Sequence, residues 1–130
     1  MSTPLEAWQN LICALKEKHH EIKKAEQTAL DFLAQGDQAS YKKFMEEKAK
    51  LIANLHDSLL NLLEKLPVNL KAQIEPLLQH FSKSAALGLK LGSLFYWSSL
   101  LYRDDHKVGE PDNLEVLIAK MQTEGLAFTK

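Results

Sequence analysis

The sequence predicts an all-α protein: an antiparallel helical hairpin, a kinked third helix and a short fourth helix, packed as a bundle in one domain of residues 1–130. Good helix formers, chiefly Leu, Ala, Lys and Glu, dominate the composition. Apolar residues recur at three- and four-residue spacing along much of the chain, which is the period of an amphipathic helix. Five glycines and four prolines are too few for the turns of an all-β fold.

The first expected helix covers residues 3–34. Thr3 stands where it can cap the helix, and Pro4 occupies the first helical position, where its missing N–H costs nothing. Gly36 follows the last apolar residue of the pattern, and glycine is favoured just past a helix end. So short a turn places the next helix antiparallel to the first.

The second expected helix covers residues 38–66 and is ended by Pro67. Its apolar seam contains one charged residue, Lys48. A lysine can pack its aliphatic stem while its ammonium group reaches water. We expect Lys48 to do so.

The third expected helix covers residues 69–102 and kinks near Pro76, because an internal proline removes a backbone hydrogen bond. A charged loop follows it. We expect a short fourth helix over residues 113–123, with an apolar face, and a loosely held tail over residues 124–130.

The stretch from Ala85 to Tyr102 is the most apolar of the chain, and a helix that is apolar on every side must be covered on every side. Small residues lie one turn apart along one side, and we expect the hairpin to pack closely there, against Ser84, Gly88 and Gly92. The opposite side exceeds what three partly polar helices can cover. We therefore expect a partner to bind Leu89, Tyr96, Trp97 and Leu100. The alternative is that these aromatic residues are simply core.

Charge and composition exclude several classes of protein. The net charge is −1, and the basic residues alternate with acidic ones, so no segregated basic surface for nucleic acid is expected. The single cysteine, Cys13, allows no internal disulfide and is typical of a reducing compartment. Lys90 interrupts the apolar stretch, which argues against a membrane span, and the N-terminal residues lack a signal-peptide layout. We expect a cytoplasmic protein.

The chain shows no catalytic motif. It contains no Gly-rich phosphate loop, nucleophile elbow or HExxH sequence, and we assign no catalytic residue and no cofactor. His19 and His20 lie among charged residues in the manner of a solvated helix face, so we also expect no metal site. We therefore expect the protein not to be an enzyme.

The segment HFSKSAA, residues 80–86, resembles the phosphorylated motif of histidine phosphotransfer domains, which are four-helix bundles of this size. His80 and Lys83 match that motif, whereas Ser84 replaces its glycine and Ser82 replaces an apolar residue. The resemblance implies, as an alternative function, that His80 accepts a phosphoryl group.

Residues 25–55 resemble the N-terminal hairpin of flagellar and type III export chaperones of the FlgN type. The residues that carry the resemblance are Glu26, Leu30, Gly36, Glu47, Lys48 and Leu51. It implies a chaperone whose C-terminal helix binds a substrate protein. The second half departs from that family, because its most apolar segment stands where those chaperones have a polar binding helix.

The function that these observations favour is a non-enzymatic protein-interaction module: an adaptor, a chaperone or an inhibitor. Its partner is another protein or a second copy of the chain, and a homodimer comes first because symmetric dimers are the commonest oligomers. Besides phosphotransfer, one further alternative stays open: a bundle that binds a small ligand in a cavity beside Gly88 and Gly92.

Overall fold

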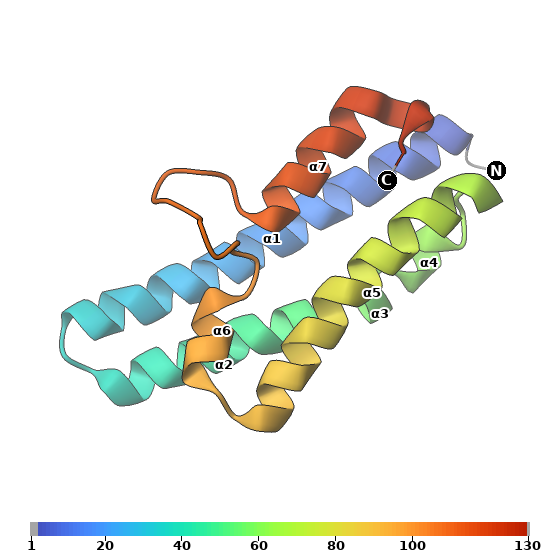
Figure 1. Cartoon of the computed structure of the whole chain (residues 1–130). Coiled ribbons are helices and arrows are strands. Elements are labelled where there is room, and N and C mark those ends of the chain that lie inside the picture. The colour runs from blue at the N-terminus through green and yellow to red at the C-terminus, as the bar shows by residue number, and fades with distance from the viewer. Residues whose placement is uncertain (1–2, 130) are drawn as a thin grey trace.

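The computed structural model describes residues 3–129, and within them it confirms the all-α class, with no strand. The helices α1 (Pro4–Ala34) and α2 (Gln38–Ala53) form a long antiparallel hairpin. Figure 1 shows α5 (Val68–Leu91) lying along α2, and α7 (Asn113–Glu124) lying along the N-terminal half of α1. The remaining elements are α3 (Leu55–Ser58), α4 (Leu60–Leu63), α6 (Leu94–Ser99) and η1 (Gly125–Ala127). Among residues 3–129, every helix is too short or too polar to cross a membrane.

The hairpin forms as the sequence predicts. Thr3 Oγ1 accepts a hydrogen bond from the backbone N–H of Glu6 at 3.1 Å, which caps α1. Gly36 has φ +80°, a left-handed conformation that glycine adopts at low cost, and it reverses the chain. Asp37 then caps α2 by accepting from the backbone N–H of Ser40 at 3.0 Å.

The expected second helix over residues 38–66 is not continuous, because a side chain from α5 interrupts it. The Ser82 hydroxyl donates to the carbonyl of Ile52 at 2.9 Å and accepts from the backbone N–H of His56 at 3.0 Å. In an unbroken helix these two backbone groups would bond to each other. The inserted hydroxyl replaces that bond, so α2 ends at Ala53 and the chain continues as α3 and α4.

The expected third helix over residues 69–102 is also divided, at Gly92. α5 runs through Pro76 and ends at Leu91, where Gly92 adopts a left-handed conformation with φ +63°. Ser93 then caps α6 by accepting from the backbone N–H of Tyr96 at 3.2 Å. The chain therefore reverses after Leu91, and α6 lies against α2 and α5.

This reversal changes how the small residues pack. A Cβ atom built on Gly88 would lie 2.5 Å from Cδ1 of Tyr96, so α6 approaches α5 most closely there. A Cβ on Gly92 would meet no atom within 4 Å, and Ser84 is only half-buried. The expectation that the hairpin packs along all three residues is wrong. Gly88 accommodates the chain's own α6, and Gly92 ends a helix.

The C-terminal segments α7 and η1 pack against α1. Asp112 caps α7 in a reciprocal arrangement with Glu115, near the expected start of the fourth helix. Beyond α7 the tail is held rather than loose, because Phe128 is 2% exposed and its ring lies 5.4 Å from that of Trp8. The Trp8 indole also donates to the carbonyl of Met121 at 3.1 Å. Lys130 lies outside the described residues.

The segment that joins α6 to α7 has an unusual backbone conformation. The loop between α6 and α7 contains Leu101, which has φ +72°, a conformation that a branched side chain rarely adopts. Its carbonyl accepts a hydrogen bond from the backbone N–H of Asn113 at 2.8 Å. Leu101 thus ties the start of this loop to the start of α7, and it directs the following residue, Tyr102, toward the hairpin.

We predict that Gly88→Ala changes stability with opposite signs in two backgrounds. In the natural chain the new methyl group meets the Tyr96 ring, and the free energy of unfolding should fall by about 1–3 kcal/mol. In a Tyr96→Ala background the methyl has room, and the better helix propensity of alanine should raise stability by up to about 1 kcal/mol. Urea unfolding of the four proteins measures both effects. Equal effects in both backgrounds would contradict the packing described.

Candidate functional site

The predicted partner-binding side is covered by its own chain. Trp97 is 3% exposed and Leu100 is 7% exposed, while Leu89 and Tyr96 are half-buried. The reason is the turn at Gly92, which lays α6 against α2. The expectation that this side lacks cover is wrong, and the alternative that the aromatic residues belong to the core describes Trp97. Apolar packing alone holds the Trp97 indole, whose buried N–H makes no hydrogen bond to a described residue.

An exposed apolar surface lies instead at the turn between α5 and α6. Phe95 is 81% exposed, Leu91 is 63% exposed and Leu87 is 48% exposed. We call these three residues the apolar corner. Figure 1 shows this turn at the end of the bundle away from α7. A glycine followed by a capping serine, Gly92-Ser93, inside the apolar stretch is a sequence signal for the turn, but it does not indicate which apolar residues are exposed there.

A buried ion pair lies at the centre of the hairpin. The ammonium of Lys48 is 2.6 Å from Glu26 Oε2, and the two side chains are 1% and 9% exposed. The ammonium also donates to the carbonyl of Ser98 at 3.2 Å and lies 4.9 Å from the centre of the Tyr102 ring. The expectation that this ammonium reaches water is wrong, because a carboxylate, a carbonyl and an aromatic ring replace the water.

The second oxygen of the same carboxylate completes a network. Glu26 Oε1 accepts from the Lys23 ammonium at 2.9 Å and from the hydroxyl of Tyr102. Lys23 also donates to the Tyr102 hydroxyl oxygen at 2.6 Å. The network joins α1, α2 and the loop after α6, three segments that are distant in sequence.

The network shifts the pKa values of its four ionisable groups. Burial alone raises the pKa of Glu26, but the Lys48 charge and three hydrogen bonds outweigh it and hold this pKa below its ordinary value. Burial lowers the pKa of Lys48, and attraction to Glu26 offsets only part of that effect. Burial and the hydrogen bond to Glu26 raise the pKa of Tyr102 to about 12. For Lys23, burial is outweighed by the bonds to Tyr102 and Glu26, so its pKa is raised.

A second polar cluster fastens α7 to α1. His19 Nε2 lies 2.8 Å from Asp112 Oδ2 and 3.8 Å from Glu115 Oε1. One nitrogen and two oxygens lie within 4.8 Å of one another, a separation compatible with metal ligands. The capping bonds of α7 and the bond to His19 engage all these atoms, however, so the cluster is accounted for as a helix cap without an ion. Burial raises the pKa of Asp112, but His19 and the capping bond hold it below its ordinary value.

The remaining candidate residues are spread over the surface. His80 is exposed on α5, and so is Lys83 one turn further along. Exposure is one requirement for a phosphoryl acceptor, and the phosphotransfer alternative stays a prediction. Cys13 is exposed on α1.

The described residues form no enclosed cavity between Gly88 and Gly92, where the ligand-binding alternative requires one. The Tyr96 ring fills the space at Gly88, and Gly92 faces open space. A pocket of about 240 Å³ lies nearby, among residues that include His80, Ser84 and Tyr96. A larger cleft lies elsewhere, between α1, α2 and the loop after α6.

Comparison of the chain with protein-family models, curated proteins and solved structures finds no match. The resemblance to export chaperones therefore stays a prediction. In the structure, two of the residues that carry it, Glu26 and Lys48, form the buried ion pair, and a third, Gly36, forms the hairpin turn.

We predict that Glu26→Gln lowers the free energy of unfolding by about 3–5 kcal/mol, because it leaves the buried Lys48 ammonium without its carboxylate. Adding Lys48→Met should restore most of this loss, since no buried charge then lacks a partner. Glu46→Gln is the matched control, because it removes an exposed ion pair between Glu46 and Lys50, both on α2. This change should lower the free energy of unfolding by less than about 0.5 kcal/mol. Urea unfolding of Glu26→Gln, Lys48→Met, their double variant and Glu46→Gln measures these effects. Additive losses in the double variant would contradict the pairing.

Acid should destabilise the fold through the same carboxylates. Glu26 and Asp112 have lower pKa values in the folded chain than in the unfolded chain. Such groups contribute stability above about pH 4 and lose it as the pH falls through their folded pKa values. Asp112→Asn should therefore flatten the acid side of the stability profile, measured by urea unfolding between about pH 2 and pH 7. Asp105→Asn, at a side chain 85% exposed, should leave the profile unchanged.

Proposed function

We propose that this chain is a non-enzymatic protein-interaction module that docks through its apolar corner, Leu87, Leu91 and Phe95. The observation that carries the proposal is the 81% exposure of Phe95 beside two exposed leucines. Phenylalanine is normally among the more buried residue types, and exposed apolar residues that gather in one place mark interaction sites. The role of an adaptor, a chaperone or an inhibitor fits such a surface.

The core beneath the corner supports this role. Trp97 is buried on α6, and Gly88 allows Tyr96 to pack against α5. These contacts fix the angle between the two helices and hold Phe95 outward. Tyr96 and Trp97, which the sequence predicted to contact a partner, thus support the apolar corner from beneath.

A second copy of the chain is the first partner to consider. In a symmetric dimer the same patch meets itself, so six apolar side chains are covered at once. Each contributes on the order of 1.5–3 kcal/mol when fully buried, and association costs on the order of 4–15 kcal/mol of motional freedom. The corner is small, so the dimer should be weak and its population should depend on concentration.

Sedimentation equilibrium from about 10 µM to about 1 mM tests the proposal. The mean mass should rise toward that of a dimer, and Phe95→Ser should weaken association at least about tenfold while leaving the melting temperature nearly unchanged. Val116→Ser is the control, because Val116 is 49% exposed on α7, outside the corner. A mass that stays monomeric throughout would overturn self-association, as would equal association of the Phe95→Ser variant.

A further inference from the structure

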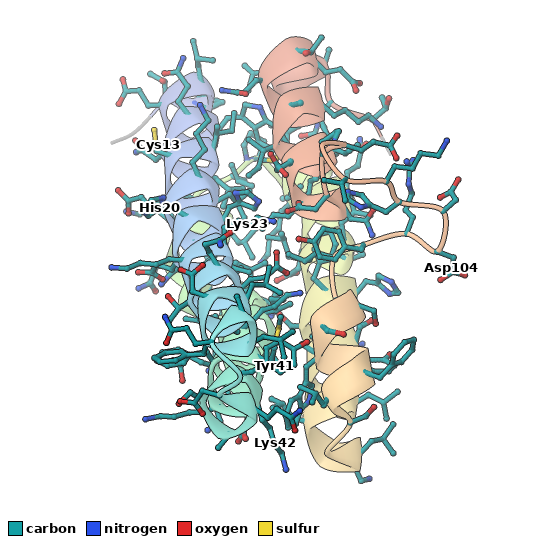
Figure 2. All side chains as sticks on the ribbon, turned by 90° about the vertical axis from the view of Figure 1, so that its left-hand side faces the viewer. Cys13, His20, Lys23, Tyr41, Lys42 and Asp104 are labelled. Atoms are coloured by element: carbon teal, nitrogen blue, oxygen red, sulfur yellow. The ribbon has the colours of Figure 1, made fainter. Side chains whose placement is uncertain are left out.

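A cleft with a volume of about 660 Å³ lies beside the buried network. The hairpin forms one wall and the loop between α6 and α7 forms the other. Figure 2 shows this loop, marked by Asp104, projecting from the helical bundle. A volume of this size is within the range of small-molecule sites.

One part of the hairpin wall of the cleft is apolar. Leu30, Tyr41 and Met45 line it, and Leu30 is 41% exposed. Val108 and Pro111 line the loop side, and Val108 is 104% exposed. A ligand that fills the space between this exposed valine and the apolar wall would bury apolar surface on both, which favours binding.

The polar groups of the cleft favour a cation. Its lining holds three carboxylates, Glu26, Glu110 and Glu115, against the single ammonium of Lys23. Glu26 is buried and paired with the Lys48 ammonium, so its carboxylate is not available to a ligand.

The two other carboxylates, Glu110 and Glu115, lie at the rim of the cleft, where their side chains are 41% and 44% exposed. Glu110 Oε2 has only a distant partner, Arg103 at 3.9 Å, and Glu115 Oε2 makes no hydrogen bond to a described residue. Acceptor capacity therefore remains at the rim, and a protonated amine would use it.

We propose that this cleft binds a small organic cation, a protonated amine on a short apolar or aromatic body. The body lies against Leu30, Tyr41 and Met45, and the ammonium group faces Glu110 and Glu115. Val108 covers the body from the loop. This site is distinct from the apolar corner, and it holds a small molecule rather than a protein.

Titration of the full chain with phenylbutylamine, followed by calorimetry and by amide chemical shifts, tests the proposal. Phenylbutyrate is the matched ligand with the same body and the opposite charge. The amine should bind at least about fivefold more tightly than the acid, because the rim attracts one and repels the other. The shifts should be largest at Tyr41, His106 and Val108, which line the cleft.

Variants separate the charge from the apolar contribution. Glu110→Gln should weaken binding of the amine about two- to fivefold, the size of an exposed ion pair, and leave binding of neutral phenylbutanol unchanged. Val108→Ser should weaken the binding of phenylbutylamine, phenylbutyrate and phenylbutanol alike. Asp104→Asn is the control, an acidic residue of the same loop that does not line the cleft.

Three results would overturn the proposal: no saturable binding of the amine, equal affinity for amine and acid, or an equal loss with Asp104→Asn and Glu110→Gln. Phe95→Ser, which alters the apolar corner, should leave amine binding unchanged. A loss of amine binding in that variant would place the ligand at the corner and would also overturn the proposal.

Discussion

The architecture depends on one buried ion pair, Lys48 with Glu26. Taking two charges out of water is expensive, and the pair is tolerated only because further groups satisfy both ions: a carbonyl and an aromatic ring for the ammonium, and a phenol and a second ammonium for the carboxylate. These groups come from α1, α2, α6 and the loop that follows it. The pair is satisfied only when all of these segments are in place, so it links the hairpin to the distant part of the chain.

The reversal at Gly92 determines which apolar residues are core and which are surface. One straight helix would have continued beyond Leu91 along the axis of α5. The turn instead buries Trp97 against α2 and leaves Phe95 in water. Trp97 and Phe95 are two residues apart in sequence, but Trp97 stabilises the fold and Phe95 is exposed and available for association. The close contact between Gly88 and Tyr96 fixes this division.

Local sequence signals predicted the helix starts, because a cap depends on residues a few positions apart. Thr3 caps the first helix as the sequence indicates, and α7 begins at residue 113, where the fourth helix was expected. The break after Ala53 depends on a hydroxyl from Ser82, and the burial of Lys48 depends on Glu26 and Tyr102, so neither follows from local spacing. The all-α class could therefore be predicted, whereas the exposed corner and the cleft could not. Each arises from segments that meet only in the folded chain.

The backbone at Leu101 shows how the network is maintained. A left-handed conformation costs a residue with a branched side chain roughly 1–2 kcal/mol, and a glycine at this position would avoid that cost. Leucine is nevertheless 7% exposed, so its side chain recovers by apolar burial what its backbone loses. Strain and burial thus act on the same residue in opposite directions. Three contacts hold this strained backbone in place: Tyr102 in the network, the Leu101 side chain in the core, and the Leu101 carbonyl on the N–H of Asn113. Loss of any one of them would leave the cost of the left-handed conformation to be met by the other two.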